Sequence, residues 1–308
     1  MWAVHFAKSL RPIAKIRENL ALHSSLKIGG YADIWFEPRT LCDLWQGVLF
    51  AREEGIPFYI VGAGTNIVFP DEGIKGVVAA LDGEFQTISF DIDSCCAGCG
   101  VGIQTLLRES LIRSLGGCEF LAGIPGTVGG AIAMNAGTAQ DAIGKAVSEV
   151  ICLDRDRGIV RLGPEELRFG YRTCALEDRI ALFCKLRLLR KERAEIMTTI
   201  YAHLQRRKKM QDYSAPNAGC AFKNPACTQE GAGFLIEAAG LKGYRIGGAM
   251  VSKKHANFII NTGMARSSDV VQLMRFIQKK VWKERGVWLE PEYRFIGSFH
   301  EEVLLNGK

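Results

Sequence analysis

Residues 120–137 read FLAGIPGTVGGAIAMNAG, with glycine at positions 123, 126, 129, 130 and 137. Glycine has no Cβ, so it adopts positive φ angles and lets a ligand or another segment approach its backbone closely. Consecutive backbone N–H groups in such a loop form a concave site for anions, particularly where a helix begins. The stretch therefore predicts a phosphate-binding loop, with a tight turn as the alternative.

A shorter glycine-rich segment lies upstream. Residues 59–68 read YIVGAGTNIV, an apolar run typical of a strand that opens into a turn at Gly62 and Gly64. Before it, Thr40 can cap a helix over 41–54 that leads into a strand over 58–61. This βαβ pattern puts the loop at the carboxyl end of a strand, where α/β sheets bind ligands. Two such loops favour a diphosphate, and hence a dinucleotide, over two ordinary turns.

The composition is that of an ordinary globular protein. The chain has 308 residues, 48% hydrophobic and 23% charged, with a formal net charge of +6. This length suits two or three domains. No apolar run reaches the roughly 20 residues of a membrane-spanning helix, and no signal peptide is predicted. The mild positive charge fits anionic small molecules as well as a weak nucleic-acid surface.

Ten cysteines lie at positions 42, 95, 96, 99, 118, 152, 174, 184, 220 and 227. Many lie in apolar runs, where cysteine behaves as a small hydrophobic residue. Without a predicted signal peptide, the pattern favours reduced thiols, and we expect a cytoplasmic protein. Cys96 and Cys99 form a C-x-x-C, but no second pair or histidine follows at zinc spacing, so no metal site is predicted.

Hydrophobic periodicity predicts further elements. They are helices over 14–22, 102–115, 232–239 and 267–284 and strands over 147–153, 158–162, 181–189 and 288–296. The chain becomes charged and helical at residue 190, which indicates a domain boundary near residue 195. The basic run at 206–209 is typical of a solvated helix C-terminus, which the helix dipole favours.

Six motifs then occur in one order: VGAGTN at 61–66, EFLAGIPGTVGGAIAMNAG at 119–137, FGYRT at 169–173, AGCAFKNP at 218–225, KHANFIIN at 254–261 and GVWLEPEYRFIG at 286–297. Together they resemble the UDP-N-acetylenolpyruvoylglucosamine reductase (MurB) family of peptidoglycan synthesis, over nearly the whole chain. Only 47 residues separate Arg172 from Cys220, which is similar to the shorter, type II branch of that family.

The resemblance implies an α+β fold of three domains. FAD-binding subdomains over 1–82 and 83–194 would form a vanillyl-alcohol-oxidase-type fold, and 195–308 would form an α/β substrate-binding domain with the C-terminal catalytic strand. Family members pass two electrons and a proton from NADPH, through FAD, to an enolpyruvyl double bond. The implied reaction converts the enolpyruvyl ether of UDP-N-acetylglucosamine to UDP-N-acetylmuramate.

This reaction builds negative charge beside a carboxylate and then needs a proton. The resemblance implies that Arg172 stabilises this negative charge, because its guanidinium can bind a carboxylate through two N–H donors. The alternative is that Arg172 is an ordinary surface arginine. The resemblance also implies that Cys220 donates the proton, at a position where the family more commonly has serine. A thiol is a far better acid than an alkyl hydroxyl, and a structural cysteine is the alternative.

The third catalytic residue is Glu292, which matches the second glutamate of the family's LEPE motif. An ionised carboxylate would repel the developing charge, so we expect Glu292 to hold a proton in the substrate complex. In a strand, Glu290 would lie on the same face, and periodicity does not separate the two.

The resemblance also implies two binding sets. The cofactor-binding set is Gly62, Ala63, Gly64, Thr65, Asn66, Ile67, Gly123, Ile124, Pro125, Gly126, Thr127, Gly129, Gly130, Ala131 and Asn135. Ala63 and Thr65 replace the more usual Gly and Ser, but both keep their N–H groups. The substrate-binding set is Tyr171, Lys209, Asn224 and His255; for His255 a core or loop histidine is the alternative.

Two other functions fit parts of the sequence. An FAD oxidase or dehydrogenase of the same cofactor fold would lack the set Arg172, Cys220 and Glu292. A non-enzymatic anion- or nucleic-acid-binding module would use the basic run at 206–209. The resemblance favours a monomeric reductase that binds NADPH and a UDP-sugar enolpyruvyl ether, without a nucleic-acid partner or membrane insertion.

Overall fold

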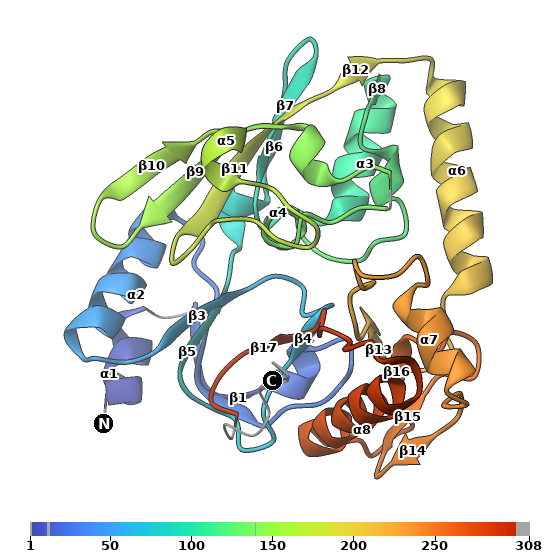
Figure 1. Ribbon diagram of the computed structural model, residues 1–308. Coiled ribbons are helices and arrows are strands. Elements are labelled where there is room, and N and C mark those ends of the chain that lie inside the picture. The colour runs from blue at the N-terminus through green and yellow to red at the C-terminus, as the bar shows by residue number, and fades with distance from the viewer. Residues whose placement is uncertain (1, 11–12, 139, 300–308) are drawn as a thin grey trace. The chain divides into compact units, whose positions relative to one another are not determined.

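The computed structural model describes residues 2–10, 13–138 and 140–299 (Figure 1). The chain divides into two compact units. Unit 1 comprises Met1–Lys15, Trp35–Ala63 and Val78–Arg207, and unit 2 comprises Ile16–Ile34, Gly64–Val77 and Lys208–Lys308. The three-domain division stays a prediction.

The chain changes unit at five points. Four lie within β1 (Ala14–Asn19), β2 (Tyr31–Phe36), β5 (Ile74–Ala80) and α6 (Arg193–Met210), and the fifth lies between Ala63 and Gly64. A four-stranded sheet has the order β1-β2-β5-β3, where β3 is Phe58–Val61.

The main sheet of unit 1 has five strands in the order β10-β9-β11-β7-β6. Its strands are β6 (Ile88–Phe90), β7 (Ser94–Gly98), β9 (Val147–Asp154), β10 (Gly158–Leu162) and β11 (Ile180–Arg187), and β8 (Leu115–Gly116) pairs with β12 (Leu189–Arg190). Its helices are α1 (Trp2–Ser9), α2 (Leu41–Glu53), α3 (Ile103–Ile112), α4 (Val128–Ala133) and α5 (Pro164–Leu167). The neighbours in the five-stranded sheet pair antiparallel, including the predicted hairpin β9–β10.

Unit 2 contains a four-stranded sheet in the order β13-β16-β15-β14. Its elements are β4 (Ile67–Val68), β13 (Asn217–Cys220), β14 (Arg245–Ile246), β15 (Ala249–Val251), β16 (Phe258–Asn261), β17 (Arg294–Phe295), α7 (Ala232–Ala238) and α8 (Ser267–Arg285). Side chains of α8 at Val270, Met274 and Ile277 are fully buried in the core of this unit. Their spacing of three and four residues gives α8 one apolar face, as the sequence predicts.

Two predicted elements are wrong. Residues 14–22 form strand β1 and the short 3-10 helix Leu20–His23 instead of a helix. The backbone bonds from Glu37 N–H to the Ile13 carbonyl (2.7 Å) and from Leu20 N–H to the Gly30 carbonyl (2.9 Å) flank its pairing with β2. This pairing overrides the helical propensity of the segment.

The predicted strand over 288–296 is also wrong. Pro291 has no N–H to donate to a ladder. Residues 290–292 make only an antiparallel bridge with the segment around Phe222, and β17 then pairs in parallel with β4. The segment therefore changes partner halfway.

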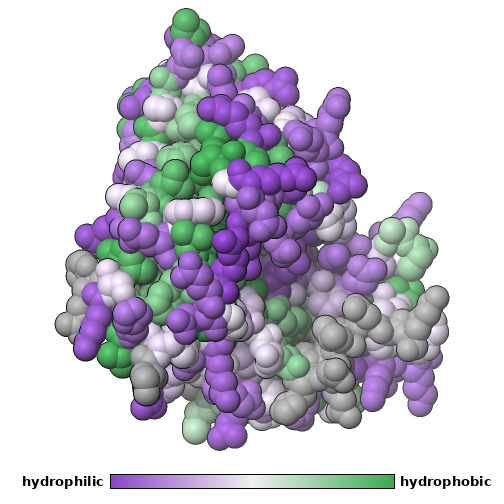
Figure 2. All heavy atoms as spheres, turned by 90° about the vertical axis from the view of Figure 1, so that its left-hand side faces the viewer, coloured by the Kyte–Doolittle hydropathy of each residue, from purple (hydrophilic) through white to green (hydrophobic). Residues whose placement is uncertain are grey.

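On the face shown in Figure 2, hydrophilic (purple) and hydrophobic (green) residues are interspersed, in keeping with a composition of 48% hydrophobic and 23% charged residues. Within residues 2–10, 13–138 and 140–299, no helix combines the length and the apolar character needed to cross a bilayer.

Candidate active site

The two glycine-rich loops meet in unit 1. A Cβ on Gly62 would lie 2.7 Å from Thr127 Oγ1. Thr127 caps α4, and its hydroxyl accepts a hydrogen bond from the Gly130 N–H at 3.2 Å. The Gly129 N–H donates to the Cys99 carbonyl at 2.9 Å, and a Cβ on Gly129 would clash with Cys99. Glycine at positions 62 and 129 is therefore required by close packing.

Arg207 holds the start of the longer loop. Its Nε donates to the Ala122 carbonyl at 2.9 Å and its second guanidinium nitrogen to the Phe120 carbonyl at 3.5 Å. The interpretation of the basic run as a solvated helix end is therefore wrong for Arg207, whereas Lys208 and Lys209 are exposed at the end of α6.

The end of the same loop contacts the segment that carries Arg172. Asn135 is buried; its Nδ2 donates to the Gly170 carbonyl at 2.8 Å and its Oδ1 accepts from the Gly144 N–H at 3.0 Å. A guanidinium nitrogen of Arg172 donates to the Gly137 carbonyl at 3.4 Å, and the guanidinium lies 5.3 Å from the centre of the Tyr171 ring. Unit 1 thus brings Tyr171, Arg172 and the glycine-rich loop together.

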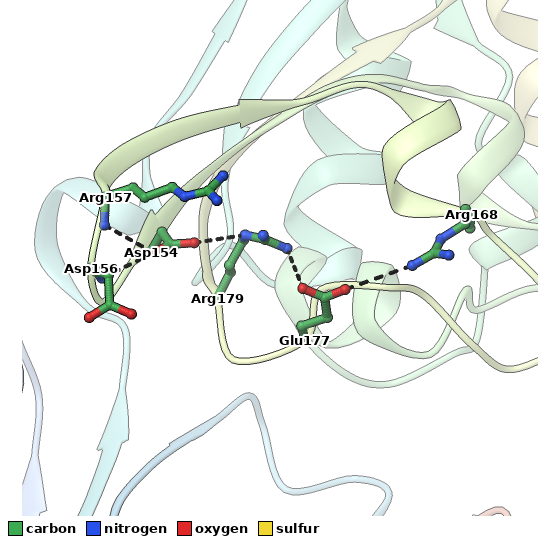
Figure 3. Close-up of polar contacts among 6 residues, drawn as sticks. All are labelled: Asp154, Asp156, Arg157, Arg168, Glu177 and Arg179. Carbon is green, nitrogen blue, oxygen red and sulfur yellow. Dashed lines mark hydrogen bonds and ion pairs between the residues drawn. The ribbon is translucent and has the colours of Figure 1, made fainter.

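An ion-pair network joins the two ends of segment 168–179, which includes Arg172 in the sequence (Figure 3). Arg168, which precedes Arg172 in the chain, pairs with Glu177, which follows it, at 3.7 Å. Glu177 also accepts a hydrogen bond from Arg179 at 2.9 Å. Arg179 Nε also donates to Asp154 at 3.0 Å, at the end of β9. The loop is thereby tied to the β9–β10 hairpin.

Asp154 also organises the turn of that hairpin. It accepts from the backbone N–H groups of Asp156 and Arg157, each at 3.0 Å. These bonds, followed by the contact with Arg179, lower the pKa of Asp154 below its ordinary value. The carboxylate therefore stays ionised at neutral pH and keeps its hold on Arg179.

In unit 2, Cys220 ends strand β13 directly after an irregularity in the pairing with β16. Asn217 pairs with Ile260 and Cys220 with Phe258, so the register shifts between them, and Gly219 has a φ of +79°. Such β-bulges bend a strand and change the direction of the next side chain. Cys220 itself is half-buried.

Asn257 fixes the segment that follows Cys220. Its Nδ2 donates to the Phe222 carbonyl at 2.8 Å, its Oδ1 accepts from the Phe222 N–H at 3.0 Å, and its own carbonyl accepts from the Ala221 N–H at 2.8 Å. The Asn257 side chain is 3% exposed. These bonds hold the Cys220 segment against the KHAN loop.

Glu292 is joined to the same segment. Its N–H donates to the Ala221 carbonyl at 2.8 Å, and its carbonyl accepts from Asn66 Nδ2 at 2.9 Å. Glu292 is half-buried, whereas the Glu290 side chain is 72% exposed and pairs with Lys223 at 3.4 Å. Exposure thus separates the two glutamates, which sequence periodicity does not. The structure brings Cys220 and Glu292 together within unit 2, and Arg172 belongs to unit 1.

The remaining predicted substrate-binding residues of unit 2 have structural contacts. Asn224 Oδ1 accepts from the Ala232 N–H at 3.0 Å, at the start of α7. His255 Nδ1 accepts from the Asn257 N–H at 3.2 Å, and its ring lies 4.8 Å from that of Phe258. Burial lowers the pKa of His255, so its ring is neutral at pH 7. These contacts support the loop-histidine alternative for His255.

Sequence reasoning missed Asn257 and Tyr293. Both lie inside quoted motifs, KHANFIIN and GVWLEPEYRFIG. A polar residue in an apolar run is a usable signal, since buried polar groups need partners. What each one binds is a long-range contact, which no local pattern predicts.

The thiols form no metal-binding cluster in the described residues, and one hollow in unit 2 lies away from the predicted site residues. Burial raises the pKa of Cys95, Cys118 and Cys152, each to about 12. In the part of the chain that the structure describes, no cluster of His, Cys, Asp or Glu could hold a metal ion. A hollow of about 500 Å³ in unit 2 is lined by residues of both charges, such as Lys27, Glu72 and Arg266, and by no predicted site residue.

Two family models match the chain. The FAD binding domain family matches residues 32–163, and the UDP-N-acetylenolpyruvoylglucosamine reductase C-terminal domain family matches residues 211–296. The chain is 40% identical over 292 residues to UDP-N-acetylenolpyruvoylglucosamine reductase 2 of Symbiobacterium thermophilum, covering 94% of both chains. It is 40% identical to the reductase of Caldanaerobacter subterraneus subsp. tengcongensis, covering 92% of this chain and 93% of that one.

A solved structure gives the same result. The crystal structure of UDP-N-acetylenolpyruvylglucosamine reductase (MurB) from Thermus caldophilus matches with a TM-score of 0.79 at 36% identity, covering 92% of this chain and 99% of that one. The predicted α+β fold and the predicted family are confirmed. The chain belongs to the UDP-N-acetylenolpyruvoylglucosamine reductase family.

Proposed function

We propose that this chain reduces the enolpyruvyl ether of UDP-N-acetylglucosamine to UDP-N-acetylmuramate, a precursor of peptidoglycan, with FAD as cofactor and NADPH as reductant. One observation carries the proposal: 40% identity to a named reductase over 94% of both chains. The two matched family models, the FAD binding domain and the reductase C-terminal domain, support the same assignment.

The residues present fit FAD. Two glycine-rich loops pack against one another where a Cβ on Gly62 would lie 2.7 Å from Thr127 Oγ1, so only glycine at position 62 allows this close approach. Gly64, Gly123 and Gly126 have positive φ angles, which glycine adopts without strain. When bound, FAD supplies the hydride that adds to the terminal methylene carbon of the substrate.

Three side chains are proposed to manage the charge and the proton. Arg172 would bind the substrate carboxylate, on which negative charge grows during the reaction. The Cys220 thiol would give its proton to the carbon next to that carboxylate, and Glu292 would donate a hydrogen bond to the same carboxylate. The backbone bond between Glu292 and Ala221 supports the pairing of the last two groups.

The test follows the colour of the purified protein. A flavin spectrum that bleaches with NADPH and recovers when the enolpyruvyl substrate is added is the expected result. In Cys220→Ala, bleaching should persist and recovery should stall, whereas Cys220→Ser should retain substantial recovery. A colourless protein, or normal recovery in Cys220→Ala, contradicts the cofactor or the proton donor respectively.

We also propose that the enzyme acts in the cytoplasm as a monomer without a nucleic-acid partner. Both substrates are soluble nucleotides, and the basic residue Arg207 is engaged with the glycine-rich loop. Sedimentation at several concentrations tests the monomer: a sedimenting species of about twice the 33.9 kDa chain mass contradicts it.

A further inference from the structure

The backbone of Gly219, the residue before Cys220, is hydrogen-bonded by side chains at both its N–H and its carbonyl. The Gly219 N–H donates to Asn217 Oδ1 at 3.1 Å, and the Gly219 carbonyl accepts from the Tyr293 hydroxyl at 3.1 Å. The carbonyl belongs to the peptide plane that contains the Cys220 nitrogen. A hydrogen bond to it therefore fixes the direction in which the Cys220 side chain leaves the backbone.

Tyr293 is built into the core of unit 2. It is 3% exposed and belongs to the buried cluster that includes Ala218 and Leu289. A buried phenol needs a hydrogen-bond partner, and the Gly219 carbonyl supplies it. Burial raises the pKa of Tyr293, and its interactions with Cys220 and then Glu292 add to the rise. The phenol therefore remains a neutral donor over the whole range in which a thiol or a carboxyl titrates.

The chain order adds a second connection. Tyr293 follows Glu292, whose N–H is bonded to the Ala221 carbonyl at 2.8 Å. Residues 292 and 293 thus contact the backbone on both sides of Cys220, at positions 219 and 221. Moving either contact would move the thiol relative to Glu292.

We infer that Tyr293 is a positioning residue for the Cys220 thiol: its hydroxyl fixes the bulge at Gly219 and so sets the direction of the proton donor. The inference rests on the proposed role of Cys220 in the reaction. It assigns to Tyr293 no proton transfer and no contact with substrate.

The first test separates the two half-reactions by stopped-flow absorbance. Tyr293→Phe keeps the ring and removes only the hydroxyl. Flavin reduction by NADPH should stay within about two-fold of the parent, whereas reoxidation by the enolpyruvyl substrate should slow on the order of ten-fold, since small misplacements of a reacting group are costly. The matched control is Tyr244→Phe, because the Tyr244 ring stacks on that of Phe276 with 4.4 Å between the ring centres, and the bond to the Gly219 carbonyl comes from Tyr293. Equal reoxidation rates in Tyr293→Phe and the parent overturn the inference.

A double-mutant cycle distinguishes this inference from the proposed function. In a Cys220→Ala background no thiol remains to be positioned, so adding Tyr293→Phe should change the residual reoxidation rate less than two-fold. An equal slowing in both backgrounds shows that Tyr293 acts independently of Cys220 and overturns the inference. Normal reoxidation in Cys220→Ala alone instead removes Cys220 from the reaction, which is a failure of the proposed function.

Thiol labelling gives a readout that does not depend on turnover. Iodoacetamide labelling, followed by mass spectrometry of the peptide that contains Cys220, measures how fast the thiol reacts with the reagent. Its rate relative to the exposed Cys227 should change several-fold in Tyr293→Phe and remain as in the parent in Tyr244→Phe. An unchanged ratio in Tyr293→Phe overturns the inference.

Discussion

The Asn257 side chain satisfies both backbone groups of one residue, Phe222, with a donated bond of 2.8 Å and an accepted bond of 3.0 Å. Phe222 is buried, with 1% of its surface exposed. The two bonds close a ring between the amide side chain, which has one acceptor and one donor group, and the two peptide groups that flank the Phe222 Cα. The Asn257 side chain of the KHAN motif thus holds Phe222, and the backbone groups of Ala221 bond to Asn257 and Glu292.

Asn257→Ala should destabilise the protein substantially. It leaves a buried N–H and a buried carbonyl without partners, and each costs about 1–3 kcal/mol. We expect the free energy of unfolding, measured with urea, to fall by about 3 kcal/mol. Asn257→Asp keeps the acceptor and loses the donor, so it separates the two bonds. A fall below about 0.5 kcal/mol in Asn257→Ala would contradict the role of this clamp.

Glu292→Gln should slow flavin reoxidation by the substrate about 10²-fold or more, the usual cost of losing one donor to a developing anion. A carboxylic acid O–H is a stronger donor to a carboxylate than an amide N–H. The matched control is Glu290→Gln, whose parent side chain is 72% exposed, and this variant should react like the parent. Stopped-flow absorbance measures both variants, and similar rates in Glu292→Gln and Glu290→Gln would remove the electrostatic role of Glu292.

Arg179→Gln should loosen the loop that carries Arg172. It removes the bonds to Asp154 and Glu177, which tie the loop to the β9–β10 hairpin. We expect faster tryptic cleavage after Arg172 and a kcat/KM lower by on the order of five-fold, because Arg172 is less well oriented. Arg161→Gln removes an exposed pair with Glu149 and is the matched control. Identical cleavage in the two variants would argue against the network.

His255 predicts a pH dependence of stability. Burial lowers its pKa in the folded protein below the ordinary value of 6.5, so the unfolded chain takes up a proton first as the pH falls. The stabilising contribution of the neutral ring is present above pH 6.5 and is lost as the pH falls through the folded pKa. Urea unfolding at pH 7.5 and 5.5 should show a smaller loss in His255→Gln than in the parent. An equal loss in both would show that His255 does not contribute.

Local sequence signals predict the elements that are stabilised locally. Thr40 predicts the start of a helix, and α2 begins with a capping box in which Thr40 and Asp43 exchange hydrogen bonds of 3.1 and 2.9 Å. The strand over 58–61, the β9–β10 hairpin and the apolar face of α8 follow from the same kind of signal. In these cases the residues that determine the element lie within it.

The failures are elements whose partner lies elsewhere in the chain. Residues 14–19 have helical propensity but extend because β2 pairs with them. Glu292 is positioned by Asn66, which is 226 residues away in the chain. The family resemblance supplied the candidate roles of Arg172, Cys220 and Glu292, which stay proposals. The contacts that position them could not be predicted, because they depend on tertiary structure.

The burial of five of the ten thiols has a consequence for inhibitor chemistry. Only a thiolate attacks an electrophile efficiently, and burial raises the pKa of Cys95, Cys99 and Cys184 well above the ordinary value. A mild electrophile at neutral pH should therefore spare these residues. An electrophilic group on a nucleotide-like inhibitor would then react with the accessible cysteine that the bound inhibitor places next to it. Cys220 could form a covalent bond with such a group, which a serine at that position could not.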